Sequence, residues 1–241
     1  MSKLLQGIQS VVRPRGVQQN VISEYIIEGV PREYMGRRAA ARERSQGRVP
    51  AVVISQGILK RNENSCSDSR KALITTEIKQ MDSLLKNLEV PFFLSTKFLL
   101  QIRAGPGSSH LLDSGDVLPI KVHKDKETGK LLNLVFLWAE KGEHLEVDVP
   151  VVVNGLESCP GIKKGGSLNK IRSTLKFLCP AENIPQKIEV DVSKLDIEEK
   201  IYMQDVEVHP SLKLLSKNEL IPICKIVGLN EEKQRVDLST L

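Results

Sequence analysis

Six arginines lie between residues 31 and 48, in a stretch with no lysine and only two acids, Glu33 and Glu43. The planar guanidinium of arginine can donate two parallel hydrogen bonds to the oxygens of one phosphate. Because two carboxylates cannot neutralise six arginines, a polyanionic partner explains the stretch better than a solvated helix face balanced by salt bridges. We therefore predict that it binds nucleic acid. The arginines are Arg32, Arg37, Arg38, Arg42, Arg44 and Arg48.

No other group of residues has the spacing of a catalytic or metal site. The four histidines have no cysteine, histidine or carboxylate at ligand spacing, and the four cysteines share no ligand spacing. Each cysteine is expected to be a small buried apolar residue in a reducing compartment. The carboxylates Asp113 and Asp116 are expected in a loop as surface charge. We expect no enzyme activity, no cofactor and no metal.

A glycine- and lysine-rich segment, 159–167, superficially resembles a phosphate-binding loop. Lys163 and Lys164 lie between Gly161 and the pair Gly165-Gly166. The segment lacks the G-x-x-x-x-G-K-[ST] spacing that a phosphate-binding loop requires. A turn with solvated lysines is the better interpretation.

Composition and charge narrow the class of protein. A chain of 241 residues that is 40% hydrophobic has room for two packed cores. Nine aromatic residues are few for a module that stacks unpaired bases on an aromatic sheet. No apolar run approaches the ~18 residues of a membrane span, so no membrane partner is expected. Residues 1–60 hold ten Lys/Arg against four Asp/Glu, whereas the rest of the chain is nearly balanced.

The periodicity of apolar residues predicts a mainly β protein with a few helices, built from two β-rich domains. One convincing helix contains Ile78, Met81, Leu84, Leu85 and Leu88, with Thr75 or Thr76 as its cap and Pro91 as its end. One or two irregular helical turns are expected over Arg37–Arg44, and a surface loop over 60–71. The strands expected before residue 147 are Ser23–Glu28, Val49–Ile54, Phe98–Ile102, Val117–Val122 and Leu131–Trp138, with a turn at Lys124–Lys130 that bends at Gly129.

A second block of strands begins near Val147. The strands expected there are Val149–Val153, Ile171–Leu178, Ile188–Val192, Ile201–Val208 and Ile221–Val227. We divide the chain into a basic extension (1–22), a barrel-forming domain (23–147), a second β domain (148–229) and a solvated tail (230–241). The extension contains no acid and places Leu4, Leu5 and Ile8 on one helical face. It has the pattern of an organelle transit peptide or of a disordered basic arm.

Two motifs resemble one known family. The first runs Arg32-x3-Gly36-Arg37-x-Ala39-x2-Arg42-x-Arg44-x2-Gly47-Arg48-Val49-Pro50-Ala51-Val52 and is similar to the opening of the bacterial large-subunit ribosomal protein family numbered twenty-five. The second resembles the start of the second domain of that family's two-domain form, the general stress protein CTC. It comprises Val149-Pro150-Val151-x3-Gly155, Pro160-Gly161-x-Lys163, Gly165-Gly166 and Ala181-x2-Ile184-Pro185-x2-Ile188-Glu189-Val190-Asp191-Val192. The resemblance covers about residues 24–228.

The resemblance implies an amino-terminal β-barrel that binds 5S ribosomal RNA and a second β domain that packs on the central protuberance of the large ribosomal subunit. The expected partners are 5S rRNA and the neighbouring ribosomal proteins and rRNA, with no small-molecule substrate. Arg32, Arg37, Arg42 and Arg44 match basic positions of the family, and Arg38 and Arg48 are additional candidates.

The hairpin expected between Val117 and Trp138 departs from the sequence pattern of the family. The family's Arg-His-Pro is replaced by Lys124-Asp125-Lys126, and its His-Val-Asp-Phe by residues 133–136. Asn133 can still donate and accept hydrogen bonds, His123 remains a candidate contact, and Lys124 and Lys126 can still meet phosphate. We therefore expect weaker readout of base edges and more reliance on phosphate contacts.

Two other functions stay open. One is a free stress-response or translation-associated RNA-binding protein, and the other is a detached anticodon-binding-like module. The acid-free extension favours a mitochondrial location, with the plastid and the bacterial cytoplasm as alternatives.

Overall fold

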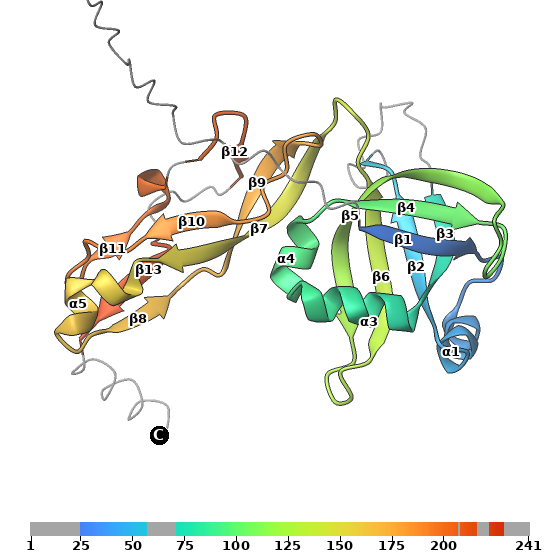
Figure 1. Ribbon diagram of the computed structural model, residues 1–241, viewed down its shortest axis with the longest axis horizontal. Helices are drawn as coiled ribbons and strands as arrows, with labels where there is room; N and C mark the ends of the chain where they lie inside the picture. The colour runs from blue at the N-terminus through green and yellow to red at the C-terminus, as the bar shows by residue number, and fades with distance from the viewer. Residues whose placement is uncertain (1–24, 57–70, 207, 216–221, 229–241) are drawn as a thin grey trace, which may run out of the picture.

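The computed structural model describes residues 25–56, 71–206, 208–215 and 222–228 (Figure 1). These residues form a closed β-barrel and a second β-rich unit beside it, as the mainly β prediction required. The expected extension at 1–22, most of the loop at 60–71 and the tail at 230–241 lie outside the described residues.

Six strands close the barrel in the order β1-β3-β2-β6-β5-β4. They are β1 (Ile26–Pro31), β2 (Arg48–Ile54), β3 (Lys71–Glu77), β4 (Phe98–Arg103), β5 (Leu111–Lys124) and β6 (Leu131–Trp138). Two of the pairs, β1 with β4 and β2 with β6, are parallel. Alternate residues of each strand fill the interior, among them Val49, Ala51, Val53, Leu134 and Phe136, all fully buried.

Among the described residues, three helices lie outside the barrel: α1 (Arg37–Ser45), α3 (Ile78–Asn87) and α4 (Val90–Ser95). The predicted helix is therefore α3, but its cap was wrong. Thr75 and Thr76 are buried in β3, a strand that the sequence did not predict, and Glu77 is the residue before the helix. Pro91 was also misassigned, because it occupies the first turn of α4, where its missing N–H costs nothing.

Several predicted strands in this unit had the wrong length. The strand expected over Ser23–Glu28 runs from Ile26 to Pro31. The strand expected over Val117–Val122 begins at Leu111, so Asp113 and Asp116 lie on β5 and not in a loop. Asp116 forms an ion pair with Lys97 at 2.9 Å.

The second unit consists of two small sheets, with strand orders β10-β7-β9-β12 and β11-β13-β8. The strands are β7 (His144–Asn154), β8 (Ser167–Lys170), β9 (Thr174–Pro180), β10 (Ile188–Asp191), β11 (Lys200–Ile201), β12 (Lys213–Leu214) and β13 (Cys224–Val227). The strand expected over Ile201–Val208 is only the two-residue β11, followed by a 3-10 turn at Met203–Asp205. The segment expected to be a plain turn contains the short helix α5 (Pro160–Lys163).

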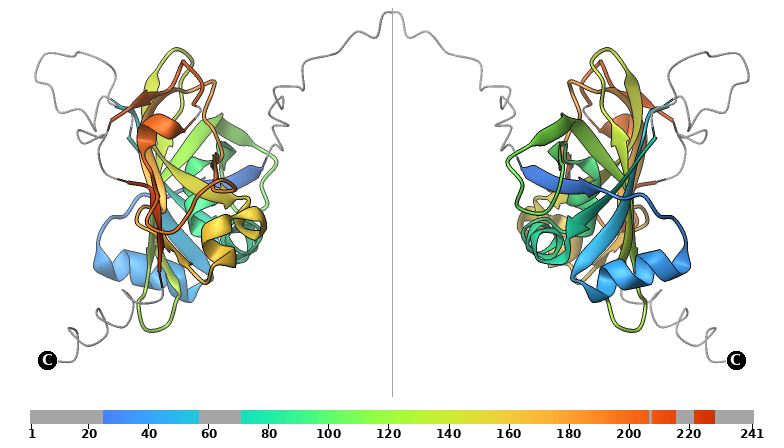
Figure 2. Two further views of the ribbon diagram at one scale, coloured as in Figure 1. Left: turned by 90° about the vertical axis from the view of Figure 1, so that its left-hand side faces the viewer. Right: turned by 90° about the vertical axis from the view of Figure 1, so that its right-hand side faces the viewer.

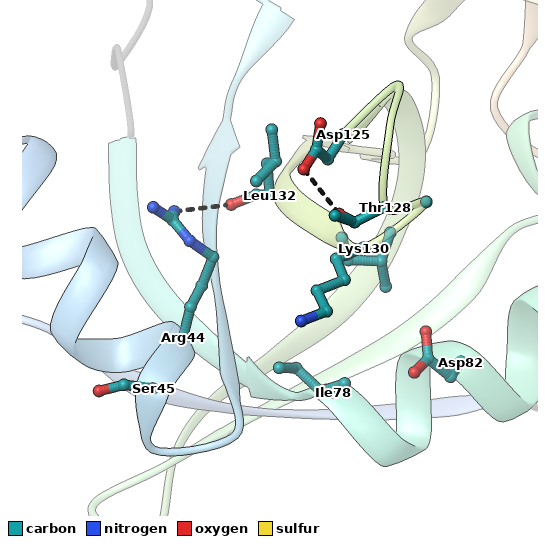
Figure 3. Close-up of a pocket in the computed structure, with 10 residues that line it drawn as sticks. Arg44, Ser45, Ile78, Asp82, Asp125, Thr128, Lys130 and Leu132 are labelled. Carbon is teal, nitrogen blue, oxygen red and sulfur yellow. Dashed lines mark hydrogen bonds between the residues drawn. The ribbon is translucent and has the colours of Figure 1, made fainter.

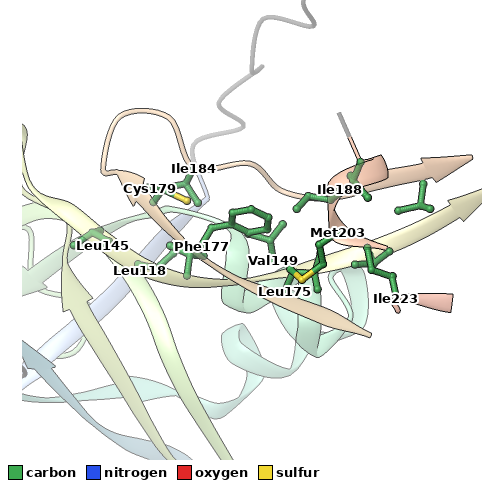
Figure 4. Close-up of a cluster of buried hydrophobic side chains, with 14 of the residues drawn as sticks. Leu118, Leu145, Val149, Leu175, Phe177, Cys179, Ile184, Ile188, Met203 and Ile223 are labelled. Carbon is green, nitrogen blue, oxygen red and sulfur yellow. The ribbon is translucent and has the colours of Figure 1, made fainter. Parts of the chain in front are cut away.

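One hydrophobic core extends from the second unit into the barrel wall (Figure 4). Leu118 of β5 and Leu137 of β6 belong to the same buried cluster as Leu145, Phe177 and other residues of the second unit. Polar contacts join the two units as well. The hydroxyl of Ser95 in α4 donates to the carbonyl of Gln186 at 2.8 Å.

The boundary expected between residues 147 and 148 stays a prediction, but Val147 lies inside β7. Residues 144–150 of β7 pair with residues 180–174 of β9. A fragment that begins at 148 thus lacks the side chains of Leu145 and Val147, which are buried in the core of the second unit. We predict that fragment 148–229 is less stable than fragment 140–229 by several kcal/mol, since losing one buried aliphatic side chain costs about 2–5 kcal/mol. Urea denaturation of the two fragments measures the difference, and equal midpoints would contradict the assignment of these residues to the second core.

Candidate nucleic-acid interface

The arginine-rich segment forms α1 on the outside of the barrel, beside the end of the β5–β6 hairpin (Figure 2). Glycines in the left-handed region flank the helix: Gly36 has a φ of 108° and Gly47 a φ of 78°. Such angles are accessible to glycine at little cost, so these residues set where the chain enters and leaves the helix. No side chain of α1 is buried, although the helix contacts β2. Its position therefore depends on contacts near its ends.

Three of the predicted arginines, Arg37, Arg38 and Arg42, are exposed on α1. At 100° per residue they occupy the solvent-facing half of the helix, and Arg38 and Arg42 are one turn apart. Two like charges one helical turn apart destabilise a helix by about 0.2–0.5 kcal/mol. None of the three arginines forms a salt bridge with another described residue that would offset this repulsion. A row of phosphates would relieve that repulsion.

Arg32 has a different environment. Its Nη1 lies 3.1 Å from Oε2 of Glu43, and both side chains are mostly buried, at 11% and 15% exposed. The backbone N–H of Arg32 donates to the carbonyl of Leu73 at 3.0 Å. Arg32 thus ties the segment before α1 to the helix and to β3, and its guanidinium is already engaged.

Arg44 and Arg48 are half-buried. Nη1 of Arg44 donates to the backbone carbonyl of Leu132 at 3.2 Å, which fastens the last turn of α1 to β6. Arg48 begins β2, where it pairs in register with Glu77 of β3. Both residues remain candidates for a phosphate contact, but each also has a structural partner or neighbour.

The hairpin places His123 of β5 opposite Asn133 of β6. Val122 and Leu134 pack in the barrel core, so the alternating side chains of His123 and Asn133 point to the outer face. Lys121 faces Val135 on that same outer face and is exposed. The structure therefore brings His123 and Asn133 together and adds Lys121, which sequence reasoning missed although it precedes His123 by one strand period.

Lys124 and Lys126 lie beyond this row, at the turn of the hairpin. A register shift separates Lys124 from His123, and both lysines are exposed. Asp125 shapes the turn, since its carboxylate accepts hydrogen bonds from the Thr128 hydroxyl at 2.6 Å and the Glu127 N–H at 3.3 Å. These bonds, that of Thr128 first, hold the pKa of Asp125 below its ordinary value. Asp125 is thus a turn-forming residue that stays ionised.

A cavity of about 630 Å³ opens between the end of α1, the start of α3 and the hairpin turn (Figure 3). Two cations, Arg44 and Lys130, and two carboxylates, Asp82 and Asp125, line it together with apolar side chains. Equal numbers of opposite charges make it a poor phosphate site. The exposed face of α1 is therefore the stronger candidate.

The second unit has a balanced surface. Four of its nine described lysines pair with carboxylates, and hydrogen bonds from three of these ammonium groups lower the pKa values of Glu189, Asp196 and Glu198. The pairs are Lys164–Asp196, Lys176–Asp148, Lys187–Glu189 and Lys225–Glu198. Residues 148–229 hold eleven Lys/Arg and eleven Asp/Glu, so this unit has no net positive charge to attract a polyanion.

The described residues carry no sign of other chemistry. Among them no group of three His, Cys, Asp or Glu side chains is placed to hold a metal ion. None of the described helices combines the length and apolarity needed to cross a membrane. Cys159, Cys179 and Cys224 are buried free thiols, and burial raises the pKa of Cys179 to about 11. Cys66 lies outside the described residues.

The different environments of Arg32 and Arg42 predict that only the loss of Arg32 lowers stability. Arg32→Gln leaves the mostly buried Glu43 carboxylate unpaired, so we expect it to lower the free energy of unfolding by about 1–3 kcal/mol. That loss corresponds to about 2–4 °C in Tm per kcal/mol for a chain of this size. Arg42→Gln removes an exposed charge and should leave Tm within about 1 °C of the parent protein. Thermal unfolding checks both, and equal effects would contradict the division between a structural and a free arginine.

The chain matches a family model described as the ribosomal protein TL5 C-terminal domain over residues 144–229. It is 32% identical over 210 residues to the large ribosomal subunit protein bL25 of Rhodopseudomonas palustris (strain TIE-1), which covers 86% of this chain and 81% of that relative. The bL25 of strain BisB5 is 32% identical over 211 residues, covering 86% and 80% of the two chains. The bL25 of Afipia carboxidovorans is 28% identical over 208 residues, covering 86% and 78%. With matched sequence across both the barrel and the second unit, this chain belongs to the large ribosomal subunit protein bL25 family.

Proposed function

We propose that this protein binds 5S rRNA through its barrel and is a structural constituent of the large ribosomal subunit. One observation carries the proposal: α1 presents three exposed arginines that have no ion-pair partner among the described residues, in a chain of the bL25 family. The relatives reported above are named as ribosomal proteins, so the role we assign is assembly and not catalysis.

Phosphate contacts supply the affinity in this account. Arg37, Arg38 and Arg42 approach the RNA backbone from the exposed face of α1, and Lys121 adds a charge on the outer face of β5. Folded RNA is recognised mainly through its shape, its phosphates and accessible groove edges. A helix fixed on a rigid barrel suits that task because its charges do not have to be ordered on binding.

We expect fewer contacts with base edges than with phosphates. Asn133 and His123 lie opposite one another and can offer hydrogen bonds to bases. Val135, where the family has an aspartate, offers none, and Asp125 uses its carboxylate to form the hairpin turn. Lys124 and Lys126 at the turn, Arg44 of α1 and Arg48 of β2 are the further candidates for phosphate contacts. Arg32 acts indirectly by holding α1 in place.

The second unit meets other components of the subunit. Its equal numbers of positive and negative charges make it a poor binder of free RNA but do not hinder packing against ribosomal proteins. The two alternative functions are separated from this one by sedimentation. A ribosomal constituent co-sediments with large subunits at moderate salt, whereas a free stress-response protein does not, and an anticodon-binding-like module co-purifies with a synthetase.

We place the protein on ribosomes, and we infer a mitochondrial location from the acid-free, basic segment 1–22. The relatives reported above are bacterial, so they support the ribosome and leave the compartment open. Import of the full chain into isolated mitochondria and into plastids tests the location. Uptake by mitochondria with protection from protease is the expected result, and uptake by neither organelle would contradict it.

The arginines of α1 should determine the salt dependence of binding. Each phosphate contact in folded RNA contributes about 0.7–0.9 to the slope of log K against log salt. We predict that Arg37→Gln and Arg42→Gln each weaken binding to 5S rRNA and each flatten the slope by up to about one. Titrations of the full chain at four salt concentrations provide the measurement.

A matched control for this titration is Lys187→Gln, which removes a paired lysine from the second unit. That variant should retain the slope of the parent protein. Should Arg37→Gln, Arg38→Gln and Arg42→Gln all retain it too, α1 is not the phosphate-binding element.

A further inference from the structure

Tyr34 is the one exposed aromatic side chain of the protein. All nine aromatic residues of the sequence fall within the described ranges, and eight of them are buried or half-buried. Tyr34 is 65% exposed, and the adjacent Met35 is 64% exposed. Two large apolar side chains that face solvent in succession, in a chain that otherwise buries its rings, mark a contact with a partner.

The segment that carries Tyr34 is fixed at both ends. On one side Arg32 is held by Glu43 and by the carbonyl of Leu73. On the other side the carbonyl of Gly36 accepts the first hydrogen bond of α1, from the N–H of Ala40 at 3.1 Å. Tyr34 and Met35 therefore project from a short arch of fixed position, and their rigid mounting reduces the entropy lost on binding.

The surroundings of the arch identify the class of partner. Exposed Glu33 precedes Tyr34, and exposed Gly36 leads on to Arg37 and Arg38, the first residues of the basic face of α1. A partner that touches Tyr34 must also accept these two unpaired guanidinium groups, which favours RNA over a second protein surface. Aromatic rings stack on nucleotides of any sequence because every base has a π-face.

We propose that Tyr34 stacks on a nucleotide of the bound RNA next to the phosphates held by α1, with Met35 packed beside it. The proposal rests on the proposed function and adds a contact of a different physical kind. A stack contributes affinity without releasing counterions, so it leaves no trace in the salt dependence. A single exposed ring can stack on one nucleotide even though the protein has too few aromatic residues to stack several bases on a sheet.

The test compares Tyr34→Phe, Tyr34→Leu and Tyr34→Ala in the full chain, titrated against 5S rRNA at several salt concentrations. Tyr34→Phe should bind as the parent does, whereas Tyr34→Ala and Tyr34→Leu should bind about 5- to 100-fold more weakly, the range for loss of one aromatic stack. The slope of log K against log salt should be unchanged in all three. Ile171→Ala, a change at an exposed apolar residue of the second unit, is the matched control and should have no effect.

Other results would overturn the proposal. If Tyr34→Ala binds 5S rRNA as tightly as the parent does, the ring does not contact the RNA. If Arg37→Gln and Arg42→Gln still weaken binding in the same assay, the proposed function stands without the stack. Normal 5S rRNA binding with defective incorporation into large subunits would assign Tyr34 to a neighbouring protein instead. Equal loss in Tyr34→Phe and Tyr34→Ala would also exclude stacking. Failure of the parent chain to bind 5S rRNA would reject the proposed function itself.

Discussion

The position of α1 depends on polar contacts of its last turn, because the helix buries no side chain of its own. Glu43 forms an ion pair with Arg32 of the preceding segment, and Arg44 donates a hydrogen bond to the Leu132 carbonyl. A nine-residue helix with like charges one turn apart is unstable in isolation. The barrel therefore supplies the free energy that keeps a strongly basic helix folded, and this allows its remaining arginines to stay unpaired until a partner neutralises them.

The barrel can hold the helix because its own architecture is closed. β2, on which α1 rests, is bonded to β3 on one side and to β6 on the other, so it lies away from any free edge. β5 and β6 then extend beyond α1 with Lys121, His123 and Asn133 on their outer face. The same two strands contribute Leu118 and Leu137 to the core of the second unit. One pair of strands thus supports the candidate RNA surface and the attachment of the second unit.

Sequence periodicity predicted the elements in which the buried residues are apolar and the exposed residues are polar. The strand Leu131–Trp138 was located with both ends correct, because its apolar run follows a charged turn and is closed by Glu140 and Lys141 shortly after Trp138. β3 was missed because Thr75 and Thr76 are polar yet buried, and the two threonines suggested a helix cap instead. Pro91 was read as a stop, although a proline is equally suited to the first turn of a new helix.

The candidate site was predictable in composition but not in detail. Counting charges located the basic segment, and no local pattern could show that Arg32 and Glu43, eleven residues apart, would meet in an ion pair. The replacement of a family histidine by Asp125 implied only a lost contact, whereas the structure gives this carboxylate a role in the hairpin turn. The exposure of Tyr34 depends on tertiary packing, since the sequence offers the same residue type at Tyr25 and Tyr202, which are half-buried.

Site-specific crosslinking in intact ribosomal particles tests directly whether α1 lies against 5S rRNA. Ala41 is exposed on the same face of α1 as Arg38 and Arg42, and a photoreactive amino acid placed there lies among the unpaired charges without removing any of them. The same amino acid at Leu156, an exposed position of the second unit, serves as the comparison. We expect position 41 to crosslink to 5S rRNA in large subunits and position 156 not to. Crosslinks from position 41 to protein alone, or to 5S rRNA from position 156 alone, would contradict it.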